Sequence, residues 1–177
     1  MHRYPTIIAL TGFAGAGKTT VAREILCAEH GFKRMSFAAR LKEMAVDGYV
    51  IKGERWFWDG ISKGPLERAN LQYIGDVERA KDPLVFVRPI IHALAKSTTP
   101  IVLDDCRYFN EWINLELRGA KLWRITSHNV GAANDHRSET EHLRFDPDAI
   151  IRNDIPMMDV LRRAVAEALR KTTQCVE

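Results

Sequence analysis

Residues 7–20, which read IIALTGFAGAGKTT, constrain the fold of this chain more than any other stretch. The apolar run from Ile7 to Leu10 is short and rich in β-branched residues, as buried strands are. Residues 12–19 fit the phosphate-loop pattern G-x-x-x-x-G-K-[ST], and apolar residues at helical spacing follow them. A strand, a glycine-rich loop and a helix in this order predict an α/β fold whose first strand leads into an anion-binding loop.

The residue types of this loop explain how it would hold a nucleotide. Glycines adopt backbone conformations that are closed to other residues, so several N–H groups can point into one concavity. The helix that follows adds the positive end of its dipole. Lys18 is expected to reach the β- and γ-phosphates, and the Thr19 hydroxyl to bind Mg²⁺. The predicted ATP-binding residues in this stretch are Gly12, Gly15, Ala16, Gly17, Lys18, Thr19 and Thr20.

Length and composition indicate one globular domain over residues 1–177, with 46% hydrophobic and 28% charged residues. The net charge of +3 is too small to predict binding to a nucleic acid polymer. Three widely spaced cysteines fit no metal-binding pattern and are typical of a reducing compartment. We therefore expect a cytoplasmic protein without a leader sequence or membrane span, and the sequence leaves open whether it forms a homodimer.

Strand-like and helical patterns alternate along the chain, which predicts about five parallel strands with helices on both faces of the sheet. Residues 47–65 are rich in glycine and predict a loop, and Pro89 predicts a kink in a helix over 84–96. The remaining expected strands lie near 33–38, 100–105, 120–126 and 148–151, and the remaining expected helices near 20–30, 39–46, 66–80, 109–118 and 157–171.

The aliphatic strand predicted at 100–105 ends in two carboxylates, Asp104 and Asp105. In phosphate-loop proteins, a carboxylate at the end of a neighbouring strand completes the metal site. Because successive side chains on a strand point to opposite faces, only one of the two can face the loop. We assign Asp105 to Mg²⁺ together with Thr19, and a turn or helix-capping role is the alternative for either aspartate.

Two long polar segments favour a small kinase among phosphate-loop proteins. The segments 38–82 and 127–147 lie where nucleoside monophosphate kinases carry an acceptor-binding insertion and a lid, and no N-K-x-D motif specifies guanine. Five further stretches stand out, in this order: Phe37-Ala38-x-x-Leu41-Lys42, Arg68-x-x-Leu71-Gln72-x-x-Gly75-x-x-x-Arg79-x-x-Asp82-Pro83, Asp105-x-Arg107-Tyr108-x-Asn110-Glu111, Asp135-His136-x-Ser138-Glu139 and Ile151-x-Asn153. Together with the phosphate loop, they resemble the bacteriophage-type deoxynucleoside monophosphate kinases in order and spacing.

This resemblance implies roles for individual residues. Lys42, Arg68 and Arg79 are expected to clamp the acceptor monophosphate, because a phosphate requires such cationic donors. Gln72 is expected at the acceptor base, and Arg107 at a phosphate or the acceptor sugar. The resemblance also places Asn153 at the ATP site. Each cation of the insertion could instead lie on a helix face exposed to solvent. Arg107 could instead form an ion pair with Glu111.

The lid and an aromatic cluster supply the other candidates. Arg137 and Arg144 lie in the segment 127–147, where mobile arginines would offset the charge of the transferred phosphoryl group. Trp58 would stack on an acceptor base or form part of the core of the insertion. His136, Glu139 and His142 do not have the zinc-protease spacing, and hydrogen bonding within the lid is favoured over metal binding.

The chain departs from the family pattern at two positions. Many members have an arginine after the fourth strand that leads into the lid, whereas no arginine occupies that turn here, unless Arg124 is displaced onto the role. Asp76 stands where members often carry a small hydroxyl residue. Neither the base preference nor a requirement for deoxyribose follows from the sequence.

The expected reaction is transfer of the γ-phosphoryl group of ATP, with Mg²⁺, to a (deoxy)nucleoside monophosphate, which gives ADP and the diphosphate. Two alternatives remain open. One is a small-metabolite kinase, similar to dephospho-CoA or shikimate kinases. The other is a nucleotide-binding module without catalytic activity, although that would give no reason for cations to gather in one insertion.

Overall fold

A five-stranded parallel sheet forms the centre of the protein in a computed structural model, which describes residues 6–61, 64–155 and 157–174. The strand order is β2-β5-β1-β6-β7, and every pairing between neighbours is parallel. The strands are β1 (Ile7–Thr11), β2 (Lys33–Met35), β5 (Ile101–Leu103), β6 (Lys121–Thr126) and β7 (Ala149–Arg152). The predicted α/β architecture is confirmed, and the phosphate-loop strand occupies its middle.

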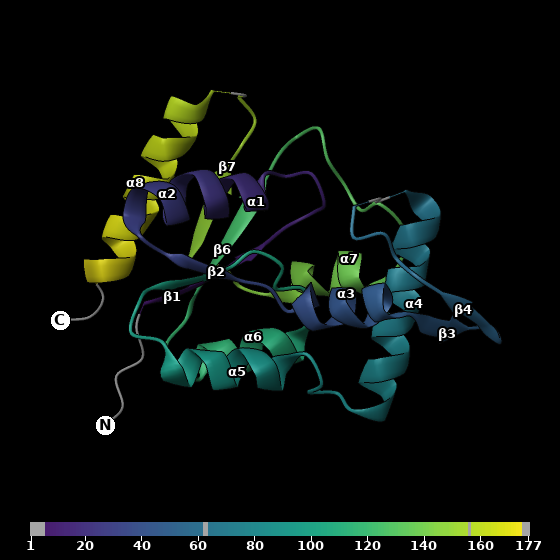
Figure 1. Cartoon of the computed structure of the whole chain (residues 1–177). Helices are drawn as coiled ribbons and strands as arrows, with labels where there is room; N and C mark the ends of the chain where they lie inside the picture. The colour runs from purple at the N-terminus through teal and green to yellow at the C-terminus, as the bar shows by residue number, and fades with distance from the viewer. Residues whose placement is uncertain (1–5, 62–63, 156, 175–177) are drawn as a thin grey trace.

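Helices cover both faces of this sheet, as the alternating pattern predicted (Figure 1). Ile8 and Leu10 of β1 pack into the core on one face, and Ile7 and Ala9 pack into the core on the other. The first face is covered by α8 (Met158–Gln174) and by one continuous helix made of α1 (Lys18–Thr20), η1 (Val21–Cys27) and α2 (Ala28–His30). The second face is covered by α5 (Val87–Lys96) and α6 (Phe109–Glu116).

The insertion has a small core of its own, in which Trp58 is only 7% exposed. Its elements are α3 (Ala38–Asp47), β3 (Tyr49–Ile51), β4 (Glu54–Trp56) and α4 (Pro65–Lys81). Trp58 packs with Leu41, Ile74 and Phe86, and its N–H donates to the carbonyl of Ala45 at 2.9 Å. Of the two predicted roles of Trp58, the structure favours the core of the insertion, because the ring is buried there.

Two local predictions in and after the insertion are wrong. Residues 47–65 were expected to form only a loop, but β3 and β4 pair as an antiparallel hairpin. Lys52 and Gly53 both have positive φ, as a tight two-residue hairpin turn requires. Pro89 causes no mid-helix kink, since α5 begins at Val87. In the first turn of a helix a missing N–H removes no hydrogen bond.

The lid segment 127–147 contains two short helical turns, α7 (Arg137–Thr140) and η2 (Glu141–Arg144). His136 caps α7, because its Nδ1 accepts a hydrogen bond from the N–H of Ser138 at 3.1 Å. Across the described ranges, no helix combines the length and the apolar character that crossing a membrane would need.

Candidate functional site

The phosphate loop follows β1 and has a backbone that only glycine permits at two positions. Gly12 and Gly17 have φ values of 130° and 102°, and a Cβ on Gly12 would lie 2.2 Å from the carbonyl oxygen of Ile125. A Cβ on Gly17 would lie 2.4 Å from Nδ2 of Asn153, which donates to the carbonyl of Ala16 at 3.0 Å. Asn153 therefore braces the loop from the end of β7, and its contact with a nucleotide stays a prediction.

Lys18 is folded back over the loop, and its side chain is almost fully covered. Its Nζ donates to the carbonyls of Gly12 at 2.8 Å and Phe13 at 2.6 Å. Burial and the nearby charge of Arg107 lower the pKa of Lys18 to about 8. A phosphate at the loop would exchange these carbonyl contacts for contacts with anionic oxygens, which bind an ammonium group more strongly.

Thr19 lies beside Asp104 and not beside Asp105. The hydroxyl of Thr19 donates to Oδ2 of Asp104 at 3.1 Å, and this oxygen also accepts a hydrogen bond from Nε of Arg34 at 2.9 Å. Thr19 and Asp104 together offer the hard oxygen ligands that Mg²⁺ prefers. The other oxygen of Asp104, Oδ1, is buried and has no hydrogen-bond partner among the described residues.

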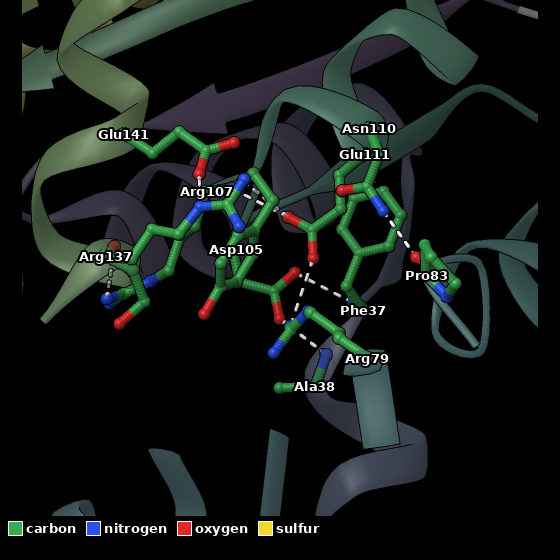
Figure 2. A network of polar contacts seen from close by, with 12 residues as sticks. Phe37, Ala38, Arg79, Pro83, Asp105, Arg107, Asn110, Glu111, Arg137 and Glu141 are labelled. Carbon is green, nitrogen blue, oxygen red and sulfur yellow. Dashed lines mark hydrogen bonds and ion pairs between the residues drawn. The ribbon is translucent and has the colours of Figure 1, made fainter. Parts of the chain in front are cut away.

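Asp105 points the other way and caps the insertion helix α3. Its carboxylate accepts hydrogen bonds from the N–H groups of Phe37 at 3.0 Å and Ala38 at 2.9 Å, and from the hydroxyl of Ser36 at 2.6 Å. Figure 2 shows the carboxylate directed at the start of this helix. The sequence-based placement of Asp105 beside Thr19 is corrected, because Thr19 bonds Asp104 while the carboxylate of Asp105 is held by the N–H groups at the start of α3.

One face of α4 carries the predicted acceptor residues and lies against the lid. Arg68, Gln72, Asp76 and Arg79 recur every three or four residues, which places them on the same face of a helix. The amide of Gln72 exchanges hydrogen bonds with Asn134 at 3.1 and 3.4 Å. Asp76 lies 2.9 Å from Nε2 of His136 and so joins the insertion to the lid.

Two arginines from separate segments converge on one lid carboxylate. Nη1 of Arg107 donates to Oε1 of Glu139, and Nη1 of Arg68 lies 3.7 Å from the same oxygen. Burial would raise the pKa of Glu139, but the charges of Arg107 and Arg68 outweigh burial and hold the pKa below its usual value. The structure thus contains an anion position between the insertion, the loop after β5 and the lid.

Arg79 lies between two aromatic rings near this position. Its guanidinium carbon is 3.8 Å from the ring centre of Tyr108 and 4.7 Å from that of Phe86. Nη2 lies 3.4 Å from Oε1 of the buried Glu111, and Figure 2 shows the two side chains facing each other. Gly75 leaves room for this arrangement, since a Cβ there would lie 2.7 Å from Nη1 of Arg79.

Among the described residues, no ion pair joins the other predicted cations to Glu139, although the Arg137 guanidinium carbon lies 5.8 Å from the centre of the Tyr108 ring that also contacts Arg79. Lys42 lies on the α3 face that carries Ala39 and Val46. Arg137 pairs with Glu141 and is largely exposed, and with the exposed Arg144 it lines a hollow beside Phe109. Their predicted roles stay predictions.

Arg124 takes no lid-entry role in this structure. Its Nη2 donates to the carbonyls of His142 at 3.1 Å and Phe145 at 2.6 Å, and so fastens the end of the lid to β6. Sequence reasoning missed Tyr108 and Phe86 beside Arg79. It gave Glu139 and His142 no more than a weak metal or hydrogen-bonding role. Among the described residues, no group of three or more His, Cys, Asp or Glu side chains is placed to hold a metal ion.

Glu111 should make stability depend on pH. Burial raises its pKa to about 7, although Arg79 opposes the shift. Between pH 4.5 and about 7, Glu111 is therefore protonated in the folded protein and ionised in the unfolded chain. As pH rises through this window, the contribution of Glu111 to the free energy of unfolding falls. Glu111→Gln keeps a hydrogen-bond acceptor for the helix cap and removes the titration.

The check is the free energy of unfolding of both proteins across that window. We expect the variant to gain stability relative to the wild-type protein as pH rises, and to stop gaining above about pH 7. A difference that stays constant with pH would contradict this reading of Glu111.

Two solved structures have a fold similar to that of this chain. TT1252 from Thermus thermophilus has a TM-score of 0.53 at 18% identity and covers 95% of this chain and 98% of its own. A gluconokinase from Sinorhizobium meliloti 1021 has a TM-score of 0.51 at 15% identity, covering 98% of this chain and 97% of its own. No protein-family model and no curated protein sequence matches this chain.

Proposed function

We propose that this protein is an ATP-dependent kinase that phosphorylates a small anionic acceptor, a (deoxy)nucleoside monophosphate. The observation that carries the proposal is the convergence of Arg68 and Arg107 on a single anionic oxygen of Glu139. This pair comes from the segments predicted to bind the acceptor phosphate. A phosphate oxygen that displaced the Glu139 carboxylate would meet the same two guanidinium groups.

The residues of the chain would act mainly by positioning and by offsetting charge, because phosphoryl transfer needs little covalent chemistry from a protein. The loop N–H groups and Lys18 would hold the phosphates of ATP, and Arg68 and Arg107 would hold the acceptor. Thr19 and Asp104 would hold Mg²⁺, which when bound offsets charge on the phosphate oxygens. Closure of the lid onto α4 would keep water from the transferred group.

The test is a coupled assay of ADP release with deoxy- and ribonucleoside monophosphates offered singly, and with a control that lacks an acceptor. The proposal expects ADP release to depend on at least one of these monophosphates. If ATP turnover is the same with and without every acceptor in the panel, the proposed activity is wrong.

A small-metabolite kinase is the second candidate. The anion position contains a carboxylate in this structure, and Arg68 and Arg107 would bind the carboxylate of a sugar acid or shikimate in the same way. One neighbour in fold is a gluconokinase. Gluconate and shikimate therefore belong in the same panel. Turnover with one of them and with no nucleotide would favour this candidate.

Arg79→Ala should weaken acceptor binding much more than ATP binding. Arg79 lies on the α4 face that carries Arg68 and Gln72, far along the chain from the phosphate loop. Loss of one charge-assisted contact corresponds to about a 10-fold or greater rise in the acceptor KM. Steady-state kinetics with each substrate varied in turn measures this.

The matched control for Arg79→Ala is Arg88→Ala, which removes an exposed arginine that pairs with Asp82. The control should leave both KM values within about 2-fold of the wild-type values, as expected for an exposed ion pair. Equal rises in the KM values of ATP and acceptor in Arg79→Ala would reject its acceptor role.

A further inference from the structure

The lid buries four polar side chains, and none of them is a lid arginine: Ser138, Glu139, Glu141 and His142. Glu139 and His142 are each 1% exposed, whereas Arg137 and Arg144 are exposed. Glu139 is already held by Arg107 and Arg68. As an ionised carboxylate it only accepts hydrogen bonds, so it cannot donate one to a phosphate. The hydroxyl of Ser138 already contacts Gln72 and His136, and Glu141 is held by the N–H of Phe109 and by Arg137. His142 is therefore the buried lid side chain that offers a donor without a partner among the described residues.

His142 has no hydrogen-bond partner for either ring nitrogen among the described residues. An imidazole in its neutral form has one N–H donor and one acceptor nitrogen, and burying both without a partner is unfavourable. Burial and the charges of Arg107, Lys18 and Arg124 lower the pKa of His142 to about 4. The ring is therefore uncharged at neutral pH and retains one donor.

The position of the ring is fixed from two sides. Its centre lies 5.4 Å from that of Phe13, a residue of the phosphate loop, with the rings edge to face. The backbone carbonyl of His142 accepts a hydrogen bond from Arg124 at 3.1 Å. The Phe13 carbonyl also holds Nζ of Lys18. The imidazole ring thus packs against Phe13, a residue of the loop over which Lys18 is folded.

We propose that His142 donates a hydrogen bond from the closed lid to the terminal phosphoryl group of an ATP held by the phosphate loop. This inference rests on the proposed kinase function. A hydrogen bond to ATP would explain why the lid has an imidazole at this buried position. An apolar ring could pack there without leaving a polar nitrogen unpartnered. This inference assigns to an uncharged donor the lid contact that the sequence had assigned to Arg137 and Arg144.

The experiment compares wild-type protein with His142→Phe, which keeps a ring and removes both nitrogens, and His142→Gln, which keeps an N–H donor. His92→Phe, at an exposed position on α5, is the control. Calorimetry measures the binding of ADP and of the β,γ-imido analogue of ATP, both with Mg²⁺ and without acceptor. Thermal melting without nucleotide gives the stability of each protein.

His142→Phe is expected to bind the ATP analogue about 10-fold or more weakly and to bind ADP within about 2-fold of the wild-type protein, since one hydrogen bond to a charged group is lost. Its melting temperature should rise, because an unpartnered buried group is gone. His142→Gln should retain part of the affinity, and His92→Phe all of it.

Equal affinity of His142→Phe and wild-type protein for the ATP analogue would overturn the inference, as would equal losses for ADP and the analogue. If His142→Phe does not fold, the same comparison is made with His142→Gln and His142→Leu. A wild-type protein that binds the analogue but phosphorylates no acceptor refutes the proposed function alone. A wild-type protein that does not bind the analogue refutes both.

Discussion

Lys18→Ala is expected to lower kcat by about 100-fold to 1000-fold or more, the range measured when one preorganised electrostatic contact to a transition state is removed. Lys18 is the cation folded over the phosphate loop, where its Nζ contacts two loop carbonyls. Its ammonium group would move from these carbonyls to the phosphate oxygens of ATP as the transferred group gains charge. Steady-state kinetics with a saturating acceptor measures the loss.

Stability separates this effect from unfolding. Burial of the charged ammonium group of Lys18 is unfavourable, and this lowers its pKa. Removal of the group should therefore not reduce the melting temperature greatly. Lys33→Ala, which removes an exposed lysine on β2, is the control and should keep wild-type kcat. If Lys18→Ala is folded and fully active, the assignment of the phosphate loop is wrong.

The second large effect is expected at Asp104. Asp104→Asn keeps the side-chain shape but removes the charge beside Thr19, so we expect kcat to fall by about 100-fold and the Mg²⁺ concentration for half-maximal rate to rise. Kinetics at several Mg²⁺ concentrations measures both quantities.

Asp105→Asn is the matched variant, because Asp105 binds the backbone at the start of α3. We expect it to lose about 1 kcal/mol of stability, as the loss of a helix cap does, and to retain most of its kcat at a temperature where it is folded. The reverse pattern, an inactive but stable Asp105→Asn and an active Asp104→Asn, would return the metal site to Asp105.

The pair Asp104 and Asp105 also shows how far sequence reasoning reached. The two aspartates at the end of an aliphatic strand predicted that a carboxylate would lie beside the phosphate loop. Strand alternation predicted that only one of the two aspartates would lie there. Which one was not predictable, because it depends on the exact residue at which β5 begins and ends. A shift of one residue along a strand reverses the direction of every side chain.

Within residues 38–82, the two helices were predictable and the structure between them was not. Helix α4 and the common face of Arg68, Gln72 and Arg79 follow from local periodicity, which the sequence displays directly. The hairpin β3–β4 was missed, although Lys52-Gly53 between two short β-prone runs is a hairpin signal. Trp58 was ambiguous because a large aromatic ring serves equally well in a core and at a ligand.

Long-range pairing was the least predictable feature. The ion pairs of Glu139 with Arg68 and Arg107 join three segments, and no local pattern brings them together. The same holds for His142, whose burial depends on how the lid packs against Phe13. Resemblance of short motifs pointed to most of these segments as functional, but their contacts required the tertiary structure.

The most direct test of the proposed activity follows the phosphoryl group itself. ATP labelled in the γ-phosphoryl group is incubated with the wild-type protein, Mg²⁺ and single acceptors, and the labelled products are separated. We predict label in a nucleoside diphosphate for at least one monophosphate, formed at least about 100-fold more slowly by Lys18→Ala. Label that appears only in inorganic phosphate, whichever acceptor is present, would contradict the assignment of this protein as a kinase.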